Sequence, residues 1–156
     1  MIKTIHIFDM DGTIVSSLHR YRLGEDGKID LAHWIENCKP EMIEKDTLLP
    51  HAALYKALLI DPTAYVVIAT ARYMTDADFE FVDQNLGMPN KFVYRHADNN
   101  HMSGAEMKIK GLQFMNNLKQ FSNAIRYFYE DNKDYLYPVA RALSAQAIFV
   151  PSEQGY

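Results

Sequence analysis

The chain has 156 residues, of which 48% are hydrophobic and 23% are charged, and its net charge is −4. This length suits one domain with a substantial core, the composition excludes a disordered chain, and the negative charge argues against broad nonspecific binding to nucleic acid.

A single cysteine, Cys38, excludes an internal disulfide and fits a reducing compartment. The N-terminus lacks a signal-peptide pattern, and no apolar run approaches the roughly 20 residues of a membrane helix. We therefore expect a cytoplasmic protein without membrane contact.

The first predicted strand, residues 3–8, ends in two carboxylates, Asp9 and Asp11, followed by a glycine and a threonine. Side chains two apart on an extended backbone point the same way, and the carboxyl edge of a parallel sheet is where ligands bind. Two neighbouring carboxylates repel each other unless a cation lies between them, and oxygen ligands favour Mg²⁺. A carboxylate can also attack phosphorus. The pattern predicts a metal-assisted phosphoryl-transfer site; the alternative is an acidic turn after a strand.

A long insertion, about residues 16–46, follows the acidic pair. Residues 21–31 resemble a small hairpin around two glycines, and residues 30–38 predict a short helix capped by Asp30. An insertion that leaves the sheet here is expected to form a flap over the site. The alternative is an ordinary surface insertion. We expect residues 1–156 to form a single domain that carries this flap.

The second predicted strand, residues 64–69, is followed directly by Thr70. Apolar spacing predicts helices over residues 47–60 and 76–86 on either side of it. A hydroxyl and a backbone N–H at a strand-to-helix junction can hold a phosphate at the same edge as the acidic pair. The alternative for Thr70 is a helix cap or a turn residue.

The third predicted strand, residues 91–95, precedes a helix that we expect from a capping box at Ser103 through Leu118. Lys108 lies near the start of this helix and therefore near the ligand edge of the sheet. Lys110 is a rival two residues on. Lys108 is preferred because it shares a helix face with apolar residues farther along, Leu112 and Met115.

The fourth predicted strand, residues 124–130, also ends in acid, at Glu130 and Asp131. A second acidic strand end completes the oxygen shell that a divalent cation needs; the alternative is an acidic turn that caps the next helix. The sequence also predicts a last helix over residues 134–144 and a fifth strand over 146–150. The alternation of strands and helices predicts an α/β fold with a parallel sheet and helices on both faces.

The joint order of these motifs resembles the haloacid dehalogenase (HAD) superfamily of phosphohydrolases. The resemblance is carried by DMDGT at residues 9–13, IATAR at 68–72, MKIKGL at 107–112 and FYEDN at 128–132. It covers nearly the whole chain and implies a Rossmann-like three-layer sandwich with a five-stranded sheet in the order 3-2-1-4-5. Within the superfamily, the phrases resemble small, nearly capless members such as the phosphatase domain of polynucleotide kinase and its RNA-repair-like relatives.

The resemblance also implies roles for individual residues. Asp9 is the implied nucleophile that forms an aspartyl-phosphate, Asp11 the general acid/base, and Thr70 and Lys108 the groups that stabilise the phosphoryl oxygens. The implied Mg²⁺ ligands are Asp9, the backbone carbonyl of Asp11, and Asp131, with Glu130 as a secondary partner. The implied substrate-binding residues are Gly12, Thr13, Ala71, Arg72 and Arg20.

The chemistry requires Asp9 ionised and Asp11 protonated when it meets the leaving group, and we expect burial near the flap to raise the pKa of Asp11. Basic side chains near the motifs suggest a basic rim, and aromatic side chains nearby could stack on a base: His19, Arg20, Arg22, Arg72, Arg95 and His96, with Tyr21, Trp34 and Tyr73. The alternative is scattered surface charge.

The leading functional hypothesis is a Mg²⁺-dependent phosphatase acting on nucleotides or on phosphorylated ends of nucleic acid, with no obligate protein partner. The alternatives are a small-metabolite phosphatase and a noncatalytic phospho-acceptor or binding module.

Overall fold

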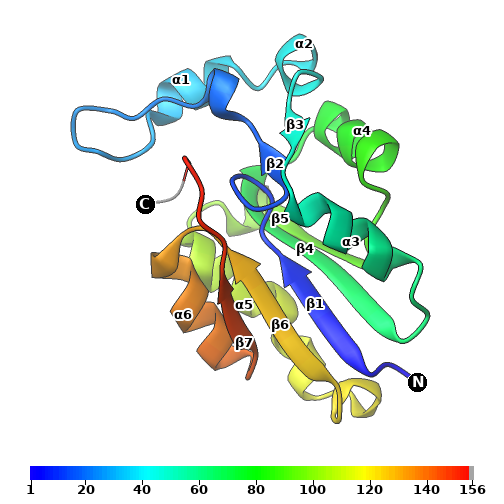
Figure 1. The fold of residues 1–156 in the computed structure, drawn as a ribbon. Helices are drawn as coiled ribbons and strands as arrows, with labels where there is room; N and C mark the ends of the chain where they lie inside the picture. The colour runs from blue at the N-terminus through cyan, green and yellow to red at the C-terminus, as the bar shows by residue number, and fades with distance from the viewer. Residues whose placement is uncertain (155–156) are drawn as a thin grey trace.

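In the computed structural model, which describes residues 1–154, five parallel strands form one sheet in the order β5-β4-β1-β6-β7 (Figure 1). The strands are β1 (Thr4–Phe8), β4 (Ala64–Tyr73), β5 (Lys91–Arg95), β6 (Ile125–Glu130) and β7 (Gln146–Phe149). Every neighbouring pair is parallel. The predicted α/β class and the strand order 3-2-1-4-5 are confirmed.

Helices cover both faces of the sheet because the strands alternate apolar side chains between two cores. On one face, Ile5 and Ile7 of β1 belong to a core shared with α5 (Gly104–Leu112) and α6 (Lys133–Ala142). On the other face, Phe8 belongs to a core shared with α3 (His51–Leu59) and α4 (Asp76–Asn85). The result is a three-layer sandwich with β1 at its centre (Figure 1). None of the helices within residues 1–154 has both the length and the apolar character needed to span a membrane.

Two element boundaries differ from the predicted ones near the carboxyl edge of the sheet. The helix predicted over 47–60 begins only at His51, because Thr47–Leu48 forms strand β3 and pairs antiparallel with β2 (Val15–Ser16). Strand β4 continues beyond residue 69 to Tyr73, with a shift of register against β5 after Ala69. The predicted motif at Thr70 therefore lies inside an irregular strand end.

The helix predicted through Leu118 is also shorter in the structure. α5 ends at Leu112, and the chain continues as the 3₁₀ turns η3 (Gln113–Asn116) and η4 (Lys119–Phe121). Gly111 lies against β5, where an added Cβ would come within 2.6 Å of Val93. Glycine permits this close packing but weakens the helix at its last turn.

Residues 16–46 project over the carboxyl edge of the sheet (Figure 1), and we call them the flap. The flap contains η1 (Leu18–Arg20), α1 (Leu31–Glu36) and α2 (Pro40–Ile43). Asp30 caps α1 as predicted, accepting a hydrogen bond from the His33 N–H at 3.0 Å. The predicted hairpin over 21–31 is reduced to a single bridge between Leu23 and Ile29. The short β2–β3 ladder brings both ends of the flap together at its base.

Candidate active site

Three buried carboxylates meet at the carboxyl ends of the neighbouring strands β1 and β6. Phe8 pairs with Tyr129 in the parallel β1–β6 ladder, so the residues that follow, Asp9 and Glu130, lie side by side. The Asp9 N–H donates to the Tyr129 carbonyl at 2.9 Å, which fixes this register. Oxygens of Asp9, Glu130 and Asp131 all lie within 4.8 Å of one another. The two acidic strand ends therefore form one cluster.

Lys108 reaches this cluster from the first turns of α5. Its fully buried ammonium group donates to Asp9 Oδ1 at 2.9 Å and to Glu130 Oε2 at 2.7 Å. Lys110, on the same helix, is exposed. Leu112 is buried, so the helix face inferred from its spacing with Lys108 is correct; Met115 is also buried but lies in η3, beyond the end of α5.

The electrostatics of the cluster leave its negative charge incompletely balanced. Burial, together with neighbouring Glu130, raises the pKa of Asp9 to about 8 against the effect of Lys108. Burial and the charge of Asp9 raise the pKa of Asp131 to about 7. Burial disfavours the charged form of Lys108, but its two carboxylate partners outweigh that effect and raise its pKa. Three carboxylates around one ammonium form an oxygen donor set that fits a hard divalent cation.

Asp11 faces a different set of partners from Asp9. Arg72 donates to both of its carboxylate oxygens, through Nε at 3.0 Å and through Nη2. The Ser17 hydroxyl donates to Asp11 Oδ1 at 2.7 Å. Burial alone would raise the pKa of Asp11, but the charge and hydrogen bonds of Arg72, with those of Ser17, lower it. The expectation of a raised pKa is therefore wrong, because the sequence did not show that a guanidinium lies against this carboxylate.

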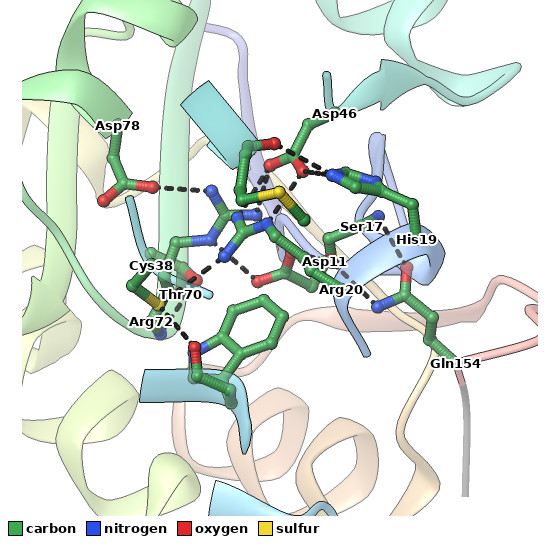
Figure 2. A network of polar contacts seen from close by, with 12 residues as sticks. Asp11, Ser17, His19, Arg20, Cys38, Asp46, Thr70, Arg72, Asp78 and Gln154 are labelled. Carbon is green, nitrogen blue, oxygen red and sulfur yellow. Dashed lines mark hydrogen bonds and ion pairs between the residues drawn. The ribbon is translucent and has the colours of Figure 1, made fainter. Parts of the chain in front are cut away.

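Arg72 belongs to a buried ionic network that joins the flap to the sheet (Figure 2). Its Nη1 donates to Asp78 at 2.7 Å and its Nη2 to Asp46 at 3.2 Å. Arg20 of the flap donates to both oxygens of Asp46, at 2.9 and 2.8 Å. The Arg20 guanidinium also lies over the Trp34 ring, 4.3 Å from its centroid.

The predicted basic rim is wrong for two of its members. Arg20 and Arg72 are 1% and 4% exposed, and their guanidinium groups are bound to carboxylates. Arg22 is largely exposed and pairs with Asp30 on the flap. Arg95 donates to three backbone carbonyls. Carboxylates and backbone carbonyls that lie close in the folded chain bind the guanidinium groups that a linear pattern suggested were free.

The residues expected to bind phosphate lie around the cluster. The Thr13 hydroxyl donates to Asp9 Oδ2 at 3.3 Å, and the buried Thr70 hydroxyl accepts from the Arg72 N–H at 3.1 Å. Gly12 has a φ of +80°, and a Cβ there would lie 2.0 Å from Asp131 Oδ2. Glycine is therefore required for the loop after β1 to approach the acidic cluster.

A cavity of about 780 Å³ opens over these groups, between the sheet edge and the flap. Asp9, Asp11, Thr70, Ala71 and Asp131 line one part of it. Apolar and aromatic side chains line another part: Tyr21, Ile29, Leu31, Trp34 and Ile35 from the flap, and Tyr73 from β4. Polar side chains border it as well, among them Arg95, Asn100 and Asn132. The three aromatic residues named from the sequence thus border the cavity.

Several residues at the site were not identified from the sequence. Ser17 binds Asp11, and Asp46 and Asp78 bind Arg72. Tyr135 lines the cavity, with its ring 5.3 Å from the Lys108 ammonium. Gln154 contacts Ser17. These side chains lie outside the four motifs, although Ser17, Asp78 and Tyr135 follow a motif within a few residues. No local pattern marks them.

Comparison with solved structures shows the class of fold. The haloacid dehalogenase-like hydrolase family protein SP0104 from Streptococcus pneumoniae superposes with a TM-score of 0.65 and 15% identity, over 97% of this chain and 88% of that one. CbbY from Rhodobacter sphaeroides, solved in complex with phosphate, gives 0.61 and 15%, over 99% and 88%. The fold is HAD-like, as the motif order implied.

Comparison with protein families is more specific. The family of bacteriophage T5 5′-deoxynucleotidase matches residues 1–148, and the chain belongs to this family. The 5′-deoxynucleotidase of Escherichia phage T5 is 34% identical over 84 residues, which are 52% of this chain. The match spans about a third (34%) of that protein's length. The finer likeness to polynucleotide kinase phosphatase domains stays a prediction.

Proposed function

We propose that the protein is a Mg²⁺-dependent phosphatase that hydrolyses 5′-deoxynucleoside monophosphates through an aspartyl-phosphate on Asp9. The observation that carries this proposal is the buried Asp9–Lys108 pair within an acidic cluster, at the floor of a cavity with an aromatic wall. Family membership supports the nucleotide substrate, because the family is described by its 5′-deoxynucleotidase.

In the first step, the Asp9 carboxylate attacks phosphorus in line with the leaving oxygen. Lys108 holds Asp9 in place and keeps a positive charge beside it. The Thr70 hydroxyl, the backbone of Ala71 and the Gly12–Thr13 turn surround the phosphoryl oxygens. Mg²⁺, held by Asp9, Asp131 and the Asp11 carbonyl, would neutralise charge on the phosphoryl group.

Asp11 serves both halves of the reaction. A phosphate dianion bound nearby opposes the ionised form of Asp11 and so favours the protonated acid that the leaving oxygen needs. Once the leaving group has departed, the hydrogen bonds from Arg72 and Ser17 and the charge of Arg72 favour the ionised form of Asp11. That form can accept a proton from the water that hydrolyses the aspartyl-phosphate.

The cavity supports a nucleotide over other phosphate esters. Aromatic side chains at Tyr21, Trp34 and Tyr73 suit a planar base, with stacking of about 1–3 kcal/mol per base. A small sugar phosphate would leave this wall without a partner. Because Arg20 and Arg72 are buried in ion pairs, the support for a nucleic-acid end that rested on an exposed basic rim is lost.

The test is a comparison of kcat/KM for a 2′-deoxynucleoside 5′-monophosphate, a 3′-phosphorylated oligonucleotide and a sugar phosphate, each with Mg²⁺ or with EDTA. We expect the deoxynucleotide to be preferred, EDTA to abolish turnover, and Asp9→Asn to lower it by roughly 10³-fold while the fold is retained. Near-wild-type hydrolysis by folded Asp9→Asn would contradict the mechanism. Equal rates with all three esters would contradict the substrate assignment alone.

A further inference from the structure

The segment after β7, residues 150–154, returns to the candidate active site (Figure 1). The Val150 N–H donates to the Glu130 carbonyl at 3.0 Å, which continues the β6–β7 ladder toward the acidic cluster. Ser152 then lies close to the loop after β1, since a Cβ on Gly12 would be 2.7 Å from its hydroxyl. Two residues later Gln154 is buried, with 6% of its surface exposed.

The Gln154 amide is bound to the flap residue Ser17 by two hydrogen bonds (Figure 2). The Ser17 backbone N–H donates to Oε1 at 3.0 Å, and Nε2 donates to the Ser17 hydroxyl at 2.9 Å. A backbone N–H can only donate, so its partner must be the amide oxygen. The amide nitrogen is then directed to the hydroxyl, and the orientation of Gln154 is determined by its partner.

This arrangement directs the proton of the Ser17 hydroxyl. The hydroxyl oxygen already accepts from Gln154, and Asp11 Oδ1 lies 2.7 Å away as the acceptor for its own proton. Without the Gln154 amide, the hydroxyl would lose its donor and the Ser17 N–H its acceptor. The chain Gln154–Ser17–Asp11 thus gives Asp11 Oδ1 a second donor besides Arg72 (Figure 2).

We infer that Gln154 is a positioning residue for the acid/base carboxyl of Asp11, acting through Ser17. The inference rests on the proposed function, since it needs Asp11 to exchange a proton with the leaving group. A carboxyl held by both Arg72 and Ser17 keeps one orientation toward the cavity, whereas a carboxyl held by Arg72 alone can tilt about that contact. Proton transfer depends steeply on such alignment.

The test compares two esters that differ in how much they need an acid. The alkoxide of a nucleoside leaves poorly without a proton, whereas p-nitrophenolate is a stable anion and leaves without help. kcat/KM covers the steps up to the aspartyl-phosphate, where this proton is transferred. We expect Gln154→Met to lower kcat/KM roughly 10- to 100-fold for the deoxynucleotide and less than about threefold for p-nitrophenyl phosphate.

Control variants separate positioning from a structural role. Ser17→Ala should reproduce the same difference between the esters, and the double variant should be no worse than either single one, because both act through one chain of hydrogen bonds. Gln120→Met makes the same change at an exposed position and should leave both rates unaltered. Equal losses for the two esters, additive losses in the double variant, or an unchanged deoxynucleotide rate in Gln154→Met would overturn the inference. The wild-type rates with the two esters test the proposed function. The change in the ratio of the two kcat/KM values on going from wild type to Gln154→Met tests the positioning role of Gln154.

Discussion

A single lysine decides the charge balance of the acidic cluster. Lys108 has no exposed surface, and both of its hydrogen bonds go to carboxylates that belong to the cluster. A buried cation of this kind is retained only if it is well paired, and its removal leaves the carboxylates without compensation. Lys108 is therefore expected to matter for both stability and turnover.

At this scale, we predict that Lys108→Met lowers kcat by roughly 10²-fold or more, because Asp9 loses the group that holds it and the phosphoryl group loses a positive charge. Lys110→Met makes the same change at an exposed position of the same helix and should alter kcat less than about twofold. Steady-state kinetics with saturating Mg²⁺, together with circular dichroism of both variants, provide the measurement. Similar losses in the two variants would show that charge on this helix, rather than the contact with Asp9, is what matters.

At the scale of elements, the flap is fastened to the sheet by ionic contacts as well as by the β2–β3 ladder. Asp46, at the end of the flap, lies between Arg20 of the flap and Arg72 of β4. All three side chains are buried. Arg72 in turn holds Asp11, so the position of the flap and the geometry of the acid/base residue share one network.

We predict that Asp46→Asn destabilises the protein by about 3 kcal/mol, because two buried guanidinium groups lose a shared carboxylate. The activity should fall as well, since Arg72 is no longer held between the flap and Asp11. Arg22→Gln breaks an exposed ion pair on the same flap and should leave stability unaltered within error. Urea unfolding of the three proteins measures this effect, and an unaltered midpoint for Asp46→Asn would show that the network does not anchor the flap.

At the scale of the whole molecule, the burial of several carboxylates links folding to pH and to metal. In the metal-free protein the pKa values of Asp9 and Asp131 are raised from 3.8 to about 8 and about 7. The folded state therefore binds protons on Asp9 and Asp131 more tightly than the unfolded state does. The stability that these protonated carboxyls contribute is fully present below pH 3.8 and is lost as the pH rises through 7 and 8. His6, whose pKa burial lowers from 6.5, acts in the opposite direction below that pH.

We predict that the free energy of unfolding of the metal-free protein falls between pH 6.5 and 8.5, a window chosen to lie above the titration of His6. Saturating Mg²⁺ should reduce this fall, because it binds the ionised carboxylates of the folded state only. Asp131→Asn should also flatten the dependence. Urea titrations at pH 6.5 and 8.5, with Mg²⁺ or EDTA, measure the free energy of unfolding. A metal-free protein that becomes more stable between these pH values would show that the cluster does not ionise there.

Much of this protein could be predicted from local sequence patterns. The run that precedes Asp9 has the composition of a buried strand, and it forms the centre of the sheet. The spacing of Lys108 with Leu112 and Met115 placed the lysine on the inner face of α5, where the structure has it. These features depend on neighbours within a few residues, so the periodicity of strand and helix carries them. The strand order came from the resemblance, which combines four such local motifs.

The arrangement around Asp11 was decided only by the tertiary structure. The sequence suggested that Arg20 and Arg72 carry free positive charges. In the structure Arg20 pairs with Asp46, and Arg72 pairs with Asp11, Asp46 and Asp78. Ser17 and Gln154 are separated by 137 residues, and neither belongs to a motif. These contacts lower the pKa of Asp11, whereas burial alone was expected to raise it. The physical reason is that electrostatic and hydrogen-bond energies depend on distances in space, which a linear pattern does not contain until the chain has folded.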